Sequence, residues 1–136
     1  MRTSGLTAQA LLTGSLAGLA ACAQTPAADS AAPRPATYLG TDAVLMGGDL
    51  VQVTVRMKGG AGADAVNDYA RCAAAGFAVK NRAGFARNVR TLTDKEGGVW
   101  HADAVYSITS ALPKGLQTID AEVAVDDCSA RGVPTE

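Results

Sequence analysis

The residues that could do chemistry in this chain of 136 residues are few: one histidine, three cysteines and scattered serines and carboxylates. His101 stands two residues before Asp103, and Ser107 and Ser110 follow. These residue types form the serine–histidine–aspartate set of acyl-transfer enzymes. In an extended strand, however, side chains two residues apart project in parallel and do not converge on a nucleophile. We therefore predict no catalytic residue and expect a protein that is not an enzyme.

Metal and phosphate chemistry have no better support in the sequence. A single histidine and separated cysteines do not provide the ligand cluster of a zinc site. The glycine-rich segment 59–64, GGAGAD, lacks the Lys-Ser/Thr ending of a phosphate-binding loop. The sequence therefore predicts no metal and no cofactor.

Composition limits the partners. The formal net charge is −1, so there is no overall electrostatic attraction for nucleic acid. Aromatic residues make up 4% of the chain, which is low for a surface that stacks bases. We predict no nucleic-acid partner, and the length suits one ordinary domain.

The first 22 residues have the three-part layout of an export signal. Arg2 supplies positive charge, a weakly apolar run extends from Leu6 to Leu19, and small residues precede Cys22. The run is too short and too polar for a membrane span, which needs about 20 apolar residues. Its glycines also weaken any packed helix. Residues 1–21 are therefore predicted to be a signal peptide.

The segment Leu19-Ala20-Ala21-Cys22 resembles the lipobox of bacterial lipoproteins. The resemblance implies that the Cys22 thiol receives a diacylglyceryl group, that the signal is cut before Cys22, and that the new amino terminus is acylated, for example with palmitate. In that family, Ala23 rather than Asp after the cysteine implies release to the outer membrane, facing the periplasm. The implied partner is the membrane itself, held through the lipid anchor.

The segment after the lipobox is rich in alanine and proline. Residues 23–37, AQTPAADSAAPRPAT, offer little apolar surface to bury, and their prolines favour an extended chain. We interpret residues 22–37 as a lipidated tether and residues 38–136 as the folded domain.

The domain begins with a clear strand and a helix. Residues 49–57 alternate between apolar and polar side chains, which predicts a half-buried strand. A helix is expected from an N-cap at Asp64 to about Lys80, with Gly84 ending it. The side chains expected to face the sheet are those of Val66, Tyr69, Cys72 or Ala73, Gly76 and Val79.

Three further strands are predicted over residues 85–93, 99–109 and 116–126, with a hairpin turn at 94–98. The second strand of the domain has the weaker pattern, because Arg87 and Arg90 would fall on opposite faces. The fold class is α+β: one helix packed on a four-stranded, mostly antiparallel sheet in the order β-α-β-β-β.

Export would change what Cys72 and Cys128 can do. Outside the cytoplasm, two remaining thiols in a small domain pair readily. The predicted strand directions bring both to the same end of the sheet, so we predict a disulfide. The alternative is a small buried Cys72 with Cys128 free near the surface.

A basic segment without intervening acids occupies residues 71–90. Its members are Arg71, Lys80, Arg82, Arg87 and Arg90. It fits a patch that faces anionic envelope polymers or lipid phosphates. The interpretation that we favour is ordinary solvated faces, with some cross-strand pairing to the acids near the end of the chain.

Two functions remain open. The first is a non-enzymatic accessory or structural lipoprotein of the cell envelope, with an envelope protein as partner. The second is a periplasmic binding module for an anionic polymer or a small ligand. The domain resembles small uncharacterised bacterial envelope lipoproteins with a strand–helix–strands core, and this resemblance carries no functional residues.

Overall fold

The computed structural model describes residues 34–115 and 117–136, which form an α+β domain. The predicted signal peptide, Cys22 and most of the predicted tether lie outside these ranges. The elements are β1 (Arg34–Gly47), β2 (Leu50–Gly60), α1 (Ala63–Lys80), β3 (Phe85–Glu96), β4 (Val99–Thr109), β5 (Thr118–Asp120) and α2 (Ala121–Ala130).

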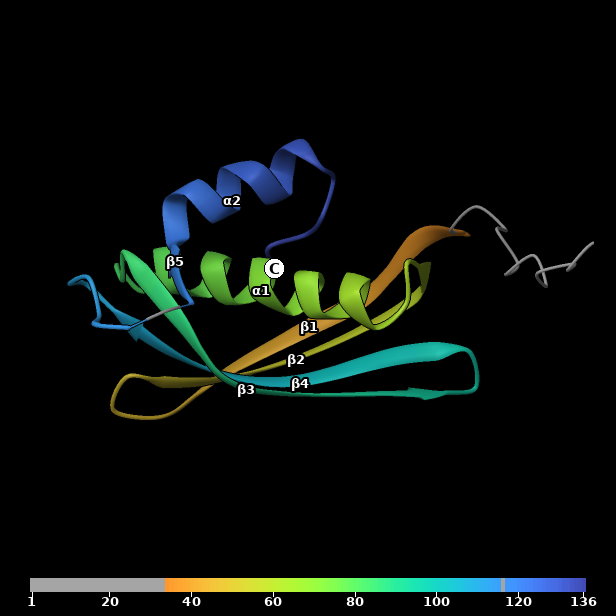
Figure 1. The fold of residues 1–136 in the computed structure, drawn as a ribbon, viewed down its shortest axis with the longest axis horizontal. Coiled ribbons are helices and arrows are strands. Elements are labelled where there is room, and N and C mark those ends of the chain that lie inside the picture. Colours follow the sequence, from red (N-terminus) through yellow and green to blue (C-terminus); the bar gives the residue numbers. More distant parts are fainter. Residues whose placement is uncertain (1–33, 116) are drawn as a thin grey trace, which may run out of the picture. The chain divides into compact units, whose positions relative to one another are not determined.

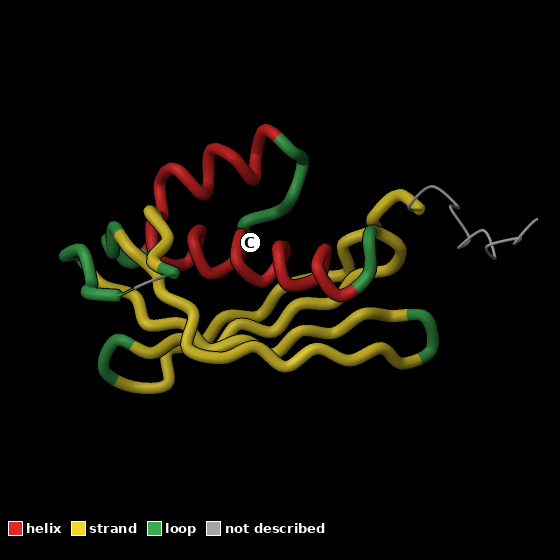
Figure 2. The backbone as a smooth tube through the Cα atoms, viewed as in Figure 1, coloured by secondary structure: helices red, strands yellow, loops and turns green. Residues whose placement is uncertain are grey.

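The five strands form one antiparallel sheet in the order β1-β2-β4-β3-β5. Helix α1 crosses one face of this sheet, and α2 lies over α1 on the side away from the sheet (Figure 1). The backbone view in Figure 2 shows the same order of layers. Among the described residues, no helix covers the other face of the sheet, here called the outer face.

Strand β2 confirms the predicted alternation. Val51, Val53, Val55 and Met57 are fully buried, and they face α1. The residues between them lie on the outer face and are partly or fully exposed. This strand supplies the apolar floor on which α1 packs.

Helix α1 matches the predicted range within two residues, but both of its predicted caps were wrong. Its N-cap is Gly62, and Asp64 lies in the first turn, where its charge favours the positive end of the helix. At the other end, Asn81 is the C-cap and Arg82 has a positive φ of 60°. The Ala83 amide donates to the Ala78 carbonyl at 2.9 Å, so the helix ends in a Schellman motif two residues before Gly84.

The predicted sheet-facing stripe of α1 is only partly correct. Val66, Tyr69 and Ala73 are buried in the core, as expected. Gly76 instead lies against the C-terminal tail: a Cβ there would meet the Thr135 carbonyl oxygen at 2.1 Å. Val79 is 38% exposed. The helix is thus packed on two sides, because α2 and the tail cover the side that the sheet does not.

Strands β3 and β4 form the predicted hairpin, with Gly97 and Gly98 both at positive φ in its turn. A bulge between Asn88 and Arg90 corrects the expectation for the basic side chains of β3. Arg87 pairs with Ser107 and Arg90 with Val105, two residues of the same face of β4. The bulge therefore brings both arginines to the outer face.

The predicted last strand over residues 116–126 was wrong. Only Thr118–Asp120 form a strand, and α2 begins at Ala121. Asp120 caps this helix by accepting a hydrogen bond from the Val123 amide at 3.1 Å. Ala121, Ala124 and Cys128 are buried at helical spacing, whereas Val123 is exposed. The segment AEVAVDD alternates like a strand, but the hydrogen bond that the Asp120 N-cap accepts stabilises a helix there.

Strand β1 was not predicted. Its first four residues belong to the segment interpreted as tether, yet they pair with the end of β2. Three register shifts interrupt the β1–β2 ladder, which weakens the alternation that marks a strand. Within the described ranges, no helix is long and apolar enough to cross a membrane.

Candidate functional site

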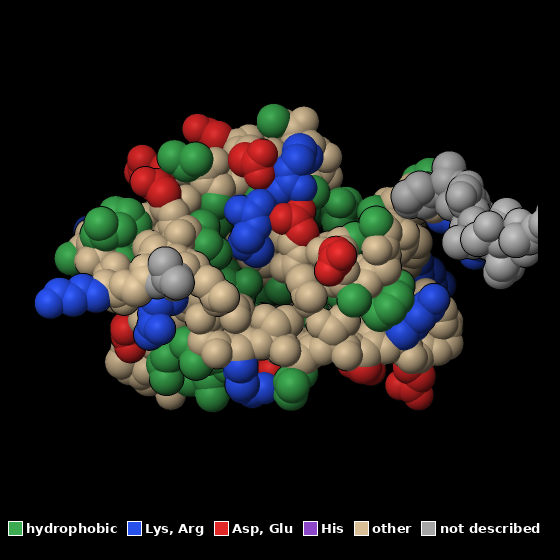
Figure 3. Space-filling view, viewed as in Figure 1, with side chains coloured by type: hydrophobic (Ala, Val, Ile, Leu, Met, Phe, Trp, Pro, Cys, Tyr) green, Lys and Arg blue, Asp and Glu red, His purple; other side chains and the backbone are tan. Residues whose placement is uncertain are grey.

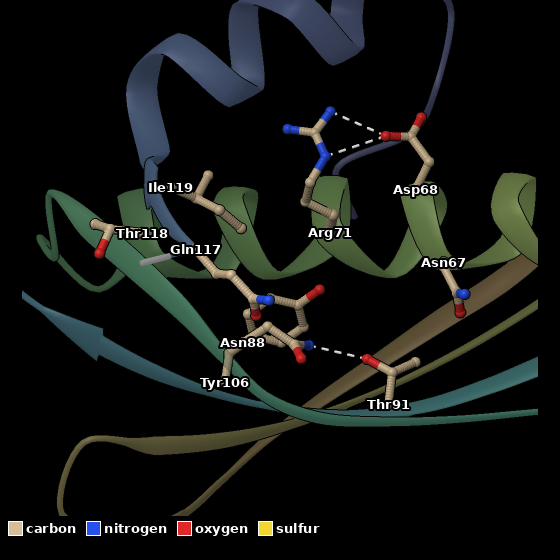
Figure 4. Close-up of a pocket in the computed structure, with 9 residues that line it drawn as sticks. All are labelled: Asn67, Asp68, Arg71, Asn88, Thr91, Tyr106, Gln117, Thr118 and Ile119. Atoms are coloured by element: carbon tan, nitrogen blue, oxygen red, sulfur yellow. Dashed lines mark hydrogen bonds and ion pairs between the residues drawn. The ribbon is translucent and has the colours of Figure 1, made fainter. Parts of the chain in front are cut away.

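A cavity of about 460 Å³ opens between α1, the sheet and the β5 segment (Figure 4). Helix α1 and strands β3, β4 and β5 place side chains around it, together with Gln117 just before β5. Its lining residues are Asn67, Asp68, Arg71, Asn88, Thr91, Tyr106, Gln117, Thr118 and Ile119. This volume lies within the range of small-molecule sites, roughly 300–1,000 Å³.

The cavity exists because β3 is polar where β2 is apolar. Asn88 and Thr91 occupy positions on the helix side of β3, where β2 carries only valine and methionine. Asn88 Nδ2 donates to Thr91 Oγ1 at 2.9 Å, and Thr93 Oγ1 donates to Asn67 Oδ1 at 2.6 Å. These short polar side chains do not fill the space between strand and helix, so it stays open.

Tyr106 of β4 forms the buried end of the cavity. Its side chain is 3% exposed, and burial raises the pKa of its hydroxyl. The amides of Asn88 and Gln117 project toward its ring (Figure 4). The tyrosine therefore stays protonated in neutral solution, as a donor and acceptor of hydrogen bonds.

The rim formed by the β5 segment is strained. Gln117 has a positive φ of 68°, which is unusual for a residue with a side chain. Thr118 Oγ1 is buried and has no hydrogen-bond partner among the described residues. In Figure 4 that hydroxyl turns away from Tyr106. Backbone strain such as that of Gln117 occurs preferentially at binding sites.

Above the cavity, charged side chains join α1 to α2. Asp68 Oδ1 accepts from Arg71 at 2.9 Å, and Arg131 also pairs with Asp68. Asp127 accepts from both arginines, at 3.3 Å from Arg71 and 2.8 Å from Arg131. Alternating blue and red side chains over α1 and α2 are visible in Figure 3. We call these four residues the ion-pair cluster.

The ion-pair cluster shifts the pKa values of its carboxyl groups. Burial acts to raise the pKa of Asp68, but hydrogen bonds from Arg131 and Arg71 outweigh it and lower that pKa. The Arg131 guanidinium is the main cause of the lowered pKa of Asp127, and Arg71 adds to it. Both carboxylates are thus held ionised, and they offset the charge of Arg71 at the mouth of the cavity.

Beside the ion-pair cluster, the predicted disulfide between Cys72 and Cys128 is confirmed, with sulfurs 2.01 Å apart. Both residues are fully buried, and Arg131 Nη2 lies 3.8 Å from each sulfur. Cys128 was expected near the end of the last strand, but it lies in α2. The bond ties the second helix to the first.

The structure does not bring the predicted basic residues together. Arg71 belongs to the ion-pair cluster, and Lys80 pairs with Glu136 at 2.8 Å. Arg87 and Arg90 lie on the outer face, where Arg90 is 3.4 Å from Asp103. Arg82 ends α1 and lines a different hollow near Asp49 and Ser110. The geometry favours separate solvated and paired side chains over a single patch.

His101, Asp103 and Ser107 of the rejected serine–histidine–aspartate set lie on the outer face, away from the cavity, and Ser110 follows the end of β4. Ser107 Oγ donates to Asp49 Oδ2 at 2.5 Å, and the Gln52 amide donates to Asp103. The cross-strand neighbours of His101 are Arg56 and Asp94. In the part of the chain that the structure describes, no group of three or more His, Cys, Asp or Glu could hold a metal ion.

The cavity residues were missed in the sequence. Short polar residues in a strand are typical of a solvated face, so Asn88 and Thr91 gave no signal of their own. Asn67 and Arg71 are four residues apart on α1, a spacing that places them on one helix face. This spacing is the feature of the sequence from which a polar face of α1 at the cavity could have been predicted.

Comparison with known proteins adds a family but no activity. The family model described as the YNQ4 C-terminal domain matches residues 38–132, which include every cavity residue and both paired cysteines. A protein of Paracoccus denitrificans, described as an uncharacterised 26.9 kDa protein in the nqo8 5′ region, is 38% identical over 85 residues. These residues are 62% of this chain and 33% of the relative, so the match spans about a third of the relative's length. No solved structure matches.

Proposed function

Because this chain belongs to the YNQ4 C-terminal domain family, whose matched relative is uncharacterised, we propose a function from its residues and its fold. It is an exported cell-envelope lipoprotein, anchored by lipid at Cys22 in the outer membrane and facing the periplasm. Its role there is non-enzymatic, as an accessory or structural subunit that contacts an envelope protein. Residues 1–21 are its signal peptide and residues 22–37 the lipidated tether.

The disulfide is the observation that supports this proposal best. Disulfides form and persist in oxidising compartments and are rare in the cytosol. Cys72 and Cys128 form one inside the domain, and the third cysteine stands in the lipobox-like segment. A chain with this division of its cysteines fits an exported protein whose remaining thiol is modified.

The test replaces Cys22 with serine and follows the protein through cell fractionation and intact-mass measurement. We expect the unaltered protein in the membrane fraction, with a mass that fits cleavage before Cys22 plus acyl chains. Cys22→Ser should leave that fraction and lose the acyl mass. A protein that keeps its first 21 residues, or that fractionates identically after the substitution, would refute lipid anchoring.

Photo-crosslinking tests the accessory role. A crosslinking side chain at Leu92, which is 61% exposed on the outer face, would capture an envelope protein that packs on the sheet. The same side chain at Val123 of α2, 65% exposed, serves as a matched control. Capture of one defined partner from Leu92 alone supports the role, and identical products from both positions contradict it.

The cavity favours a second role, that of a binding module. It places several uncharged polar side chains around one buried tyrosine. The dispersed basic residues give no support to an anionic polymer as ligand. Of the two ligands considered for a binding module, a small molecule is therefore the better fit.

A further inference from the structure

We propose that the cavity between α1 and β3 binds a neutral saccharide of one or two rings. The side-chain amides of Asn67, Asn88 and Gln117 would hold it, and Tyr106 would lie at its buried end. This inference rests on the proposed binding role and is independent of lipid anchoring. It concerns residues that all lie within the described ranges.

The first argument is the polarity of a surface that should be apolar. A helix packed on a sheet gains stability by burying apolar side chains, and β2 does this with three valines and a methionine. On β3, Asn88 and Thr91 occupy such positions with polar side chains, so the stability that apolar burial would provide there is lost. Departures from ordinary packing concentrate at functional sites. The bulge beside Asn88 and the positive φ of Gln117 are two more such departures around the same cavity.

The second argument is the hydrogen-bonding capacity of the cavity. Each primary amide offers two donor hydrogens and one acceptor oxygen. Thr93 occupies Asn67 Oδ1, which leaves the Nδ2 donor of Asn67 for a ligand. Asn88 Nδ2 donates to Thr91 Oγ1 and, at 3.5 Å, to the Arg90 carbonyl, which leaves the Oδ1 acceptor of Asn88 for a ligand. The Tyr106 hydroxyl adds a group that both donates and accepts. Sugar hydroxyls also do both, so a saccharide can satisfy all of these groups at once.

The third argument is charge. Among the described residues that line the cavity, Arg71 is the one cation, and Asp68 and Asp127 already pair with it. A carboxylate or phosphate ligand would have to compete with these two carboxylates for one guanidinium. In Figure 4 the Arg71 and Asp68 side chains turn toward each other, while the amides of Asn88 and Gln117 lie nearer Tyr106. The electrostatics therefore favour an uncharged ligand.

The fourth argument is the apolar surface. The Ile119 side chain and the Tyr106 ring give the cavity two apolar contacts between its polar groups. A pyranose ring has C–H faces that pack on such surfaces while its hydroxyls project from the edge. A mixed lining of this kind is typical of small-molecule sites.

The experiment is saturation-transfer NMR on the purified disulfide-bonded protein, with four neutral probes: glucose, N-acetylglucosamine, maltose and N,N′-diacetylchitobiose. Glucuronate and glucose 6-phosphate serve as charged counterparts of glucose. We expect at least one neutral probe to bind, and the charged counterparts to bind more weakly than glucose. Signal from none of the neutral probes at millimolar concentration, or a preference for the charged ones, overturns the proposal.

Variants then locate the site. Asn88→Ala should weaken the bound probe about tenfold, the effect expected for a lost hydrogen bond of ordinary strength. Gln52→Ala is the matched control, because it also removes an amide side chain but from the outer face. It should leave binding of the probe unchanged. Thermal unfolding of both variants shows whether they remain folded. Equal affinity for the two variants places the ligand elsewhere and refutes the assignment.

The outcome is separate from that of the localisation test. Cys22→Ser can abolish membrane attachment without altering the cavity, and a cavity that binds no probe leaves the anchor unaffected. If the protein is lipid-anchored and the probes do not bind, the accessory role stands and this inference fails.

Discussion

At the scale of single residues, Arg82 occupies a position where glycine is usual. It follows the C-cap of α1 with a φ of 60°, and the Ala83 and Arg82 amides close the Schellman motif on the carbonyls of Ala78 and Val79. A left-handed conformation costs a residue with a Cβ about 1–2 kcal/mol. This strain lies outside the cavity, so it can be removed without touching the candidate site.

We expect Arg82→Gly to stabilise the protein. Glycine adopts positive φ without strain, and part of the gain is lost because glycine has more freedom in the unfolded chain. The net change should be about 0.5–1 kcal/mol in the free energy of unfolding, measured by urea denaturation. Arg82→Ala keeps the strain and is the control. Identical unfolding midpoints for the two variants would show that φ is not the cause.

Among single residues, the paired cysteines could be predicted from the sequence and the cavity residues could not. The disulfide was predictable because cysteine has few fates in an exported domain. Asn88 and Gln117 were not, because an amide side chain has the same identity on a solvated face and in a binding site. Only the packing of β3 against α1 distinguishes the two situations.

At the scale of elements, α1 depends on Gly76 to admit the C-terminal tail. Helix propensity alone predicts that alanine is better than glycine there, by about 1 kcal/mol. The Thr135 carbonyl, however, stands 2.1 Å from the position that a Cβ would take. We expect Gly76→Ala to destabilise the protein by about 1–3 kcal/mol through this overlap.

Urea denaturation measures the sign, and limited proteolysis shows whether the tail has left α1. The control is Gly84→Ala, where the nearest atom to an added Cβ is 3.8 Å away and φ is not positive. That variant should unfold at nearly the same urea concentration as the unaltered protein. A Gly76→Ala protein more stable than both would show that the tail contact is dispensable.

The ion-pair cluster makes the attachment of α2 sensitive to acid. Folding lowers the pKa values of Asp68 and Asp127, so the unfolded chain binds more protons than the folded one in acid. The stability that these groups contribute is therefore complete above the ordinary aspartate pKa of about 4. It is lost as the pH falls through their lowered pKa values.

We expect Arg131→Ala to reduce this pH dependence, because Arg131 pairs with both carboxylates. The variant should be less stable at neutral pH, and its free energy of unfolding should fall less between pH values of about 5 and 2. Arg87→Ala, which removes an arginine of the outer face, should keep the full slope. Parallel curves for Arg131→Ala and the unaltered protein would contradict the assignment.

The elements also divide into those the sequence predicts and those it does not. The strand at β2, helix α1 and the β3–β4 hairpin each repeat a clear period or carry a Gly-Gly turn, and they were predicted. The segment 121–126 alternates like a strand, and only the capping by Asp120 reveals a helix. The bulges of β1 and β3 shift the alternation by one residue, which conceals the faces of those strands.

At the scale of the whole molecule, the disulfide closes a loop that contains β3, β4 and β5 and ends in α2. The cysteines are 56 residues apart in sequence. In the chain-entropy account, a loop of this length stabilises the folded state by about 4 kcal/mol.

Replacing both cysteines with alanine should therefore lower the free energy of unfolding by about 2–4 kcal/mol. Thermal unfolding of the double variant measures this, and the unaltered protein under reducing conditions should behave alike. If reduction has no effect while the double variant is unstable, the loss comes from packing around the buried sulfurs and not from the closed loop.

The fold class of the whole molecule was predictable, whereas its layering was not. An apolar strand face and one long helix indicate an α+β domain of two layers. The third layer, α2 on α1, follows from the disulfide and the ion-pair cluster. Those contacts join residues about 60 positions apart in sequence, which local patterns do not reveal.

The position of the closed loop has a mechanical consequence. If the protein is held at its N-terminal side and pulled at the other end, force enters through β1 and leaves through the tail. The segment between Cys72 and Cys128 cannot lengthen while the bond persists. Roughly 190 Å of contour, at about 3.4 Å per residue, is then withheld from extension. A stretched chain could lose β1, β2 and the first half of α1 and still keep the rest of α1, β3 and β4 within one closed, inextensible ring.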